Sequence, residues 1–143
     1  MLPDLDLTAD HHHQGINPLA EARTIVATDD ERGMLSLYNH MLEREGFRTF
    51  FTVDSWEVIE ICRLYDVDLV VSDIIKPDLN GLELLEHLRS DPRTRHIPVI
   101  FVSARGDASE IAFRMGAESF IHKPFHPAEL LREIHRVLGD APV

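Results

Sequence analysis

Between residues 23 and 139, short apolar runs alternate with segments in which apolar residues recur every three or four positions. The first kind of segment predicts buried strands, and the second predicts amphipathic helices. Five strands are expected, over residues 24–28, 48–53, 68–72, 97–102 and 119–122. One helix is expected after each strand, over residues 31–45, 54–65, 80–90, 107–116 and 127–138. This alternation predicts an α/β fold, in which a five-stranded parallel sheet is covered by helices on both faces.

Residues that favour helix ends support these boundaries. Residues 54–57 and 107–110 both have the spacing of a capping box, and Asn80 can cap the third helix. Glycines 46, 116 and 139 provide helix stops, and Pro127 suits a first helical position. The apolar faces predicted to point inward consist of Met34, Leu37, Tyr38, Met41 and Leu42; Val58, Ile61, Cys62 and Tyr65; Leu82, Leu85 and Leu88; and Leu130, Leu131, Ile134, Val137 and Leu138.

Composition narrows the class of protein. The 143 residues carry a formal charge of −11, with 44% hydrophobic and 27% charged residues. These values fit one folded domain and argue against nucleic-acid binding through bulk positive charge. Cys62 is the single cysteine, which excludes an internal disulfide and suits a reducing compartment. Because no apolar run of about 18 residues and no secretory signal is present, we expect a cytoplasmic protein without membrane contact.

The first 22 residues differ from the rest of the chain. They contain four acidic residues, no Lys or Arg, and the run His11–His13. Adjacent histidines without a preorganised partner make a poor metal site. We therefore expect a mobile N-terminal tail over residues 1–22 and one domain over residues 23–140.

Polar residues follow four of the predicted strands. Asp29 and Asp30 follow the first, Asp73 the third, Ser103 the fourth and Lys123 the fifth. With the doubly wound, flavodoxin-like strand order 2-1-3-4-5, the first and third strands are neighbours, so the three carboxylates share one crevice.

Carboxylates about 5 Å apart repel by roughly 3 kcal/mol at an effective dielectric of 20, so the three acids predict a bound cation. Oxygen ligands favour Mg²⁺ or Mn²⁺. Lys123 and Ser103 can contact an oxyanion in the same crevice. Together these residues predict a phosphoryl-transfer site in which Asp73 is the nucleophile.

The ordered motifs resemble those of the receiver domain of two-component response regulators. They are the acidic pair in Val26–Glu31, the stretch Val70–Pro77 with Gly81, the run Val99–Ala104, and the segment Gly116–Phe125. The resemblance covers about residues 23–138.

The resemblance implies a role for each matching residue. Asp73 is the expected phospho-acceptor, loaded from a histidine kinase or a histidine phosphotransfer protein. The expected ligands of Mg²⁺, with Mn²⁺ as a substitute, are Asp30, Asp73 and the backbone carbonyl of Ile75, together with Asp29 either directly or through water. Ser103 is the expected switch hydroxyl.

Phe120 is the expected switch aromatic. Phosphorylation would then remodel the surface of the fourth helix, fifth strand and fifth helix for a downstream protein. No enzymatic activity is expected beyond self-phosphorylation and autodephosphorylation at Asp73, and homodimerisation on phosphorylation stays open.

Three positions depart from the common family pattern. Lys76 stands before the loop proline where the family often has an apolar residue such as Met; we expect it to be a solvated surface lysine rather than one that alters metal affinity. Ile75 is apolar where many members are polar, and we expect it to shield the acyl phosphate from water. Phe120 lacks a hydroxyl, so packing alone must separate its two positions.

Other functions fit the residues less well. A magnesium-dependent phosphohydrolase would want a second Asp where Ile75 stands, and a flavodoxin-like cofactor site would want a glycine- and hydroxyl-rich loop in place of residues 29–31. A B12 site would want a loop histidine after a strand. The remaining alternative is a receiver-like protein-binding scaffold that is not phosphorylated. We expect a stand-alone receiver, with a piece of a larger regulator or hybrid kinase as the other possibility.

Overall fold

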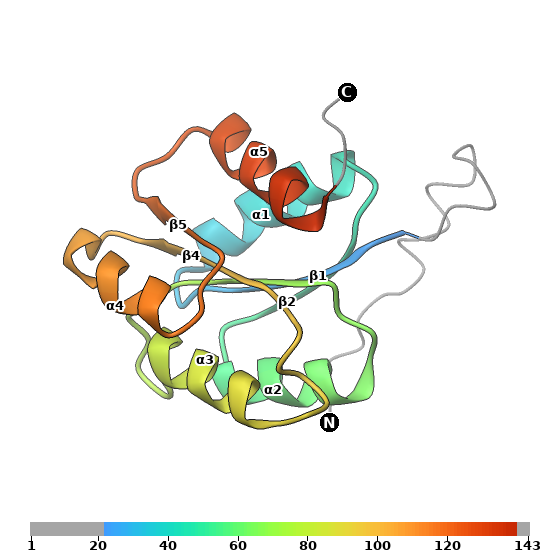
Figure 1. Cartoon of the computed structure of the whole chain (residues 1–143). Helices are drawn as coiled ribbons and strands as arrows, with labels where there is room; N and C mark the ends of the chain where they lie inside the picture. Colours follow the sequence, from blue (N-terminus) through green and yellow to red (C-terminus); the bar gives the residue numbers. More distant parts are fainter. Residues whose placement is uncertain (1–21, 140–143) are drawn as a thin grey trace.

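The computed structural model describes residues 22–139 (Figure 1). The predicted tail, including His11–His13, lies outside these residues except for Ala22, as does Asp140. The strands are β1 (Thr24–Thr28), β2 (Arg48–Thr52), β3 (Leu69–Ser72), β4 (Val99–Ser103) and β5 (Ser119–His122). The helices are α1 (Arg32–Arg44), α2 (Ser55–Leu64), α3 (Gly81–Ser90), α4 (Ser109–Arg114) and α5 (Pro127–Leu138), with a short 3₁₀ turn, η2 (Gly106–Ala108), before α4.

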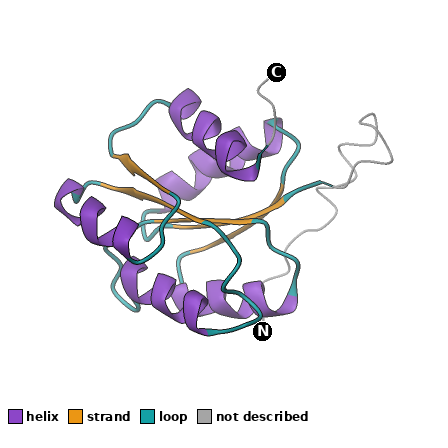
Figure 2. Cartoon of the chain, viewed as in Figure 1, coloured by secondary structure: helices purple, strands orange, loops and turns teal. Residues whose placement is uncertain are grey.

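The five strands form one parallel sheet in the order β2-β1-β3-β4-β5. This confirms the predicted fold class. Figure 2 shows the sheet as a central layer between two layers of helices. Because all strands run in the same direction, their carboxyl ends lie along one edge of the sheet, and the loops that follow β1, β3, β4 and β5 meet there.

Two hydrophobic clusters hold the helices against the sheet. On one face α2, α3 and α4 cover residues such as Val26, Val70 and Phe101. On the other face α1 and α5 cover residues such as Ile25 and Val71. Figure 1 shows the same division, with α1 and α5 above the sheet and the other three helices below it. Every residue of β1, β3 and β4 is buried, and apart from a Thr or Ser at their ends these strands are apolar, as expected for strands covered on both faces.

The helix ends confirm some predicted signals and contradict others. Asn80 and Glu83 form a complete capping box, and Gly139 ends α5 with a positive φ of 77°. The Asp54 side chain accepts a hydrogen bond from the Trp56 amide, without the reciprocal bond from Glu57 that a capping box requires.

Two side-chain predictions on the helices were wrong. Asp107 does not cap α4; it lies in η2, where its carboxylate pairs with the guanidinium of Arg105. Tyr65 is 40% exposed instead of facing the core, because α2 ends at Leu64 and the chain becomes extended at Tyr65. Its ring still packs on Phe50, with the centroids 5.0 Å apart.

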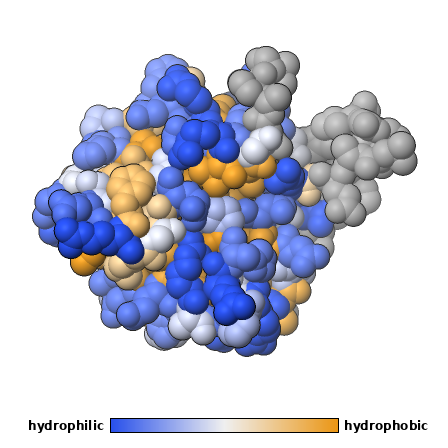
Figure 3. All heavy atoms as spheres, in the orientation of Figure 1, coloured by the Kyte–Doolittle hydropathy of each residue, from blue (hydrophilic) through white to orange (hydrophobic). Residues whose placement is uncertain are grey.

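The face of the molecule shown in Figure 3 is mostly hydrophilic, and the hydrophobic side chains on it form separate groups. Exposed apolar side chains include Trp56 on α2, whose ring meets His87 of α3 edge-on, and Ile111 and Phe113 on α4. Within residues 22–139, no helix combines the length and the apolar character needed to cross a membrane.

Candidate functional site

The predicted site residues converge at the carboxyl edge of the sheet. Thr28 of β1 is paired with Ser72 of β3, so the following residues, Asp29 and Asp73, stand side by side. The Asp73 amide donates to the Thr28 carbonyl at 3.2 Å and continues this ladder. On the other side of β3, the Lys123 amide donates to the Ser103 carbonyl at 3.0 Å. The register of the sheet therefore brings together residues from four strand ends.

Lys123 connects the two central carboxylates. Its Nζ lies 2.9 Å from Oδ2 of Asp29 and 3.2 Å from Oδ2 of Asp73, with Oε1 of Glu31 at 3.5 Å. Burial acts to lower the pKa of Lys123, but the hydrogen bonds and charges of Asp29 and Asp73 outweigh burial and raise it. The lysine is therefore a permanent cation between two carboxylates at neutral pH.

Asp29 is completely buried. Desolvation raises its pKa, while the hydrogen bonds from Lys123 and from the Glu31 amide oppose the rise. The second of these bonds, at 2.9 Å to Oδ1, fixes the carboxylate at the start of α1. A buried carboxylate held in this way needs a cationic partner, which Lys123 supplies.

The loop after β3 orients Asp73. Oδ1 of Asp73 accepts hydrogen bonds from the amides of Ile74 at 2.6 Å and Ile75 at 3.4 Å, so Oδ2 is the oxygen that faces Lys123. Gly81 begins α3 directly behind this loop, and its amide donates to the Ile74 carbonyl at 2.7 Å. A Cβ at Gly81 would collide with the Asp73 carbonyl oxygen and lie 2.8 Å from Cα of Ile74. Glycine is thus required for α3 to approach the site so closely.

Three consecutive acids could hold a metal ion. Asp29, Asp30 and Glu31 each offer an oxygen, and these oxygens lie within 4.8 Å of one another. Asp73 is not in this cluster but shares Lys123 with Asp29. Carboxylate oxygens without nitrogen or sulfur ligands fit a hard divalent cation such as Mg²⁺. The place of Glu31 beside Lys123 was not predicted, although an unbroken run of acids after a strand was a usable signal.

Lys76 contradicts the predicted surface position. Its side chain is only 7% exposed. Its Nζ donates to Oγ1 of Thr28 at 2.6 Å and to the carbonyl of Val53 at 2.5 Å. Burial lowers the pKa of Lys76, although nearby carboxylates act to raise it. The β3–α3 loop folds back over the ends of β1 and β2, and this carries the lysine inside.

The predicted switch residues lie beside the same edge. Ser103 is buried, and its Oγ accepts a hydrogen bond from the Arg105 amide at 3.1 Å. Within residues 22–139 no hydrogen bond joins this hydroxyl to Asp73 or Lys123. Phe120 lies next to Phe101 in the β4–β5 register and meets the His122 ring edge-on, with the centroids 5.2 Å apart.

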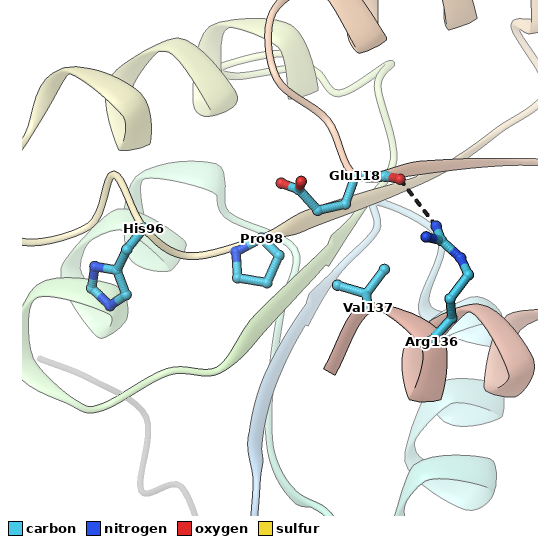
Figure 4. Close-up of a pocket in the computed structure, with 5 residues that line it drawn as sticks. All are labelled: His96, Pro98, Glu118, Arg136 and Val137. Carbon is cyan, nitrogen blue, oxygen red and sulfur yellow. Dashed lines mark hydrogen bonds between the residues drawn. The ribbon is translucent and has the colours of Figure 1, made fainter. Parts of the chain in front are cut away.

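A hollow at the opposite edge of the sheet offers no comparable chemistry. It has a volume of about 440 Å³ and is lined by His96, Pro98, Glu118, Arg136 and Val137. Figure 4 shows His96 and Arg136 at opposite ends of this hollow, with Arg136 turned toward the main-chain carbonyl of Glu118, to which it donates at 3.2 Å. These side chains do not converge on one point, so the carboxyl edge remains the candidate site.

Comparisons with known proteins identify the family of this chain. The family model of the response regulator receiver domain matches residues 25–135. The polar-differentiation response regulator DivK of Brucella ovis is 32% identical over 122 residues, which cover 83% of this chain and 98% of DivK.

Solved structures show the same fold. The CheY-like receiver domain protein of Methanospirillum hungatei JF-1 superposes with a TM-score of 0.77 and 27% identity, over 83% of this chain and 95% of that one. The receiver domain of sensor histidine kinase PA1611 of Pseudomonas aeruginosa PAO1, solved with magnesium in its active-site cleft, has a TM-score of 0.76 and 23% identity, covering 84% of this chain and all of that one. The acidic crevice with its lysine, the strand order and these matches lead to one conclusion: the chain belongs to the response regulator receiver family of two-component systems.

Proposed function

We propose that Asp73 accepts a phosphoryl group from the phosphohistidine of a histidine kinase or of a histidine phosphotransfer protein. The observation that carries this proposal is the position of Lys123, whose ammonium lies 2.9 Å from Asp29 and 3.2 Å from Asp73. Membership of the receiver family of two-component systems supports a phospho-accepting role. Receiver domains are signalling modules rather than conventional enzymes.

The orientation of Asp73 suits the transfer. Oδ1 is held by two backbone amides, and Oδ2 is the oxygen left to attack phosphorus. The O–P bond forms as the N–P bond of the phosphohistidine breaks, and the imidazole leaves with the bonding electron pair and takes up a proton from water. Lys123 offsets the negative charge on the phosphoryl oxygens, as a fixed cation does in other phosphoryl-transfer sites.

The residues present fit a divalent cation. Asp29, Asp30 and Asp73, with the carbonyl of Ile75, are the proposed ligands, and Glu31 adds an acid to the cluster. When bound, Mg²⁺ or Mn²⁺ would neutralise charge on the phosphoryl oxygens and on the carboxylates. The hard, all-oxygen donor set supports this choice of ion.

Ser103 and Phe120 would pass the change to the surface. A phosphoryl group on Asp73 offers a new acceptor to the buried Ser103 hydroxyl, and the movement of Ser103 would let Phe120 turn inward. The exposed side chains of Ile111 and Phe113 on α4 are part of the surface that would change. That surface, formed by α4, β5 and α5, is the proposed docking site for a downstream protein or for a second copy of this chain.

Incubation with acetyl phosphate, with and without Mg²⁺, followed by intact-mass measurement, tests the proposal. We expect a gain of one phosphoryl group that requires Mg²⁺ and is absent in Asp73→Asn. Asp66→Asn serves as a matched control, because Asp66 is exposed in the turn after α2, away from the carboxyl edge. Failure of the wild-type chain to gain the phosphoryl mass would instead favour a protein-binding scaffold that is not phosphorylated.

A further inference from the structure

Lys76 is a buried cation whose direct contacts are neutral. Its ammonium donates to the Thr28 hydroxyl and to the Val53 carbonyl, which lie at the carboxyl ends of β1 and β2. Among residues 22–139, no carboxylate lies within ion-pair distance of it. A buried ammonium is costly unless negative charge nearby compensates for its lost hydration. The hydrogen bonds to two neutral oxygens use two of its three N–H donors but do not balance its charge.

The compensating charge comes from carboxylates that do not contact the ammonium directly. Asp78, in the same loop as Lys76, contributes most, and Asp29, Asp30 and Asp73 of the acidic site also interact electrostatically with Lys76. Three of these four acids are the proposed metal ligands. Moreover, the sequence contains only two lysines, Lys76 and Lys123, beside twelve arginines. Both lysines therefore interact with the same acidic crevice. Lys123 contacts its carboxylates directly, and Lys76 acts over a longer distance from its position at the end of β1.

We propose that Lys76 is a positioning residue that acts as a fixed counter-charge, stabilising the ion-free acidic site and weakening its affinity for Mg²⁺. This inference rests on the proposed function, because it concerns the same metal site. A divalent ion held by Asp29, Asp30 and Asp73 gains less from these acids when a buried ammonium already offsets part of their charge. The ammonium also repels the ion directly, and salt screens a buried charge only weakly.

Calorimetric titration of Mg²⁺ into the full chain tests this inference. In Lys76→Met, a neutral side chain of similar length replaces the ammonium, and we expect Mg²⁺ to bind about tenfold more tightly than in the wild type. Lys76→Gln provides a second neutral variant if Met does not permit folding, which circular dichroism will show. We expect the same direction of change for Gln.

Thr28→Val distinguishes an effect of the Lys76 charge on Mg²⁺ affinity from an effect of the hydrogen bonds by which Lys76 anchors the β3–α3 loop. This variant removes one acceptor of the Lys76 ammonium and keeps the charge, so its Mg²⁺ affinity should stay within about twofold of the wild type. If Thr28→Val changes the affinity as much as Lys76→Met, loop anchoring rather than charge is responsible and the inference is wrong. Equal or weaker binding in both neutral variants also overturns it.

The titration also distinguishes this inference from the proposed function. If the wild type binds Mg²⁺ and the neutral variants bind no more tightly, only the role of Lys76 fails. If neither the wild type nor the variants bind Mg²⁺, the proposed metal site fails as well. Binding by the neutral variants alone would support the counter-charge role in its strongest form.

Discussion

Gly81 lies against the backbone of Asp73 so closely that any side chain would displace one of them. A Cβ at Gly81 would collide with the Asp73 carbonyl and lie 2.9 Å from Cε1 of Phe101. We expect Gly81→Ala to lower the free energy of unfolding by about 2 kcal/mol and to slow phosphorylation by shifting Asp73. Urea denaturation and the phosphodonor assay measure the two effects.

Gly33 provides the matched comparison. It lies in α1, and a Cβ there would meet nothing within 4 Å. Gly33→Ala should therefore stabilise the protein by about 0.5–1 kcal/mol, since alanine loses less backbone freedom in a helix. Equal effects of the two substitutions would contradict the proposed crowding at Asp73.

Removal of Lys123 should expose the repulsion between the two acids that it connects. Lys123→Met leaves Asp29 and Asp73 without their ammonium in a largely buried place, so we expect a loss of about 3 kcal/mol in the free energy of unfolding at pH 7. Mg²⁺ should restore more stability in this variant than in the wild type, because the ion can replace the missing charge. Arg114→Met, which removes an exposed pair with Glu110, should change little.

The pH dependence of this loss follows from the direction of the pKa shift. The pKa of Lys123 is raised in the folded protein. Its contribution is therefore complete below the ordinary lysine pKa of 10.5 and disappears only as the pH rises through the raised value. The difference between wild type and variant should persist from about pH 6 to about pH 9. A difference that vanished near pH 8 would be inconsistent with the geometry.

Ile75 should prolong the life of the phosphorylated state. Its side chain is 50% exposed and follows Asp73 by two residues, so it can cover the acyl phosphate against water. We expect Ile75→Asn to accelerate loss of the phosphoryl group several-fold, measured as the decay of the phosphorylated mass with time. Ile111→Asn is the control, since Ile111 is 48% exposed but lies on α4. An unchanged decay rate in Ile75→Asn would rule out shielding.

Cys62 should be unreactive in the folded protein. Cys62 is a residue of α2 that faces the core and is only 3% exposed, and burial raises the pKa of its thiol to about 12. Because the thiolate is the reacting form, a disulfide reagent at pH 8 should modify Cys62 far more slowly than it modifies a free thiol. The rate should rise to that of a free thiol in urea. Rapid modification of the native protein would mean that this part of the core opens readily.

The fold was predictable because each strand and helix carries its own local signal. The bounds of β1 and β5 agree with the predicted ranges, and α5 begins at Pro127 as expected. The polar residues at the strand ends also predicted the acidic crevice, since a parallel sheet places its carboxyl ends at one edge.

The missed features depend on how loops fold in three dimensions. Nothing in the local sequence shows that the β3–α3 loop carries Lys76 over the end of β1, because burial there depends on the distant residues Thr28 and Val53. Asp107 failed as a cap because Arg105, two residues away, competes for its carboxylate. Such choices between neighbouring partners are decided by geometry that a spacing rule does not contain.

The scarcity of lysine has a practical consequence for chemical labelling. Of the 143 residues, only two carry side-chain amines: Lys76, which is buried, and Lys123, which is partly accessible. Amine-directed dyes, cross-linkers and resin coupling that react with side chains will therefore attack the residue between Asp29 and Asp73. Attachment through a thiol introduced away from the carboxyl edge would leave Lys123 unmodified.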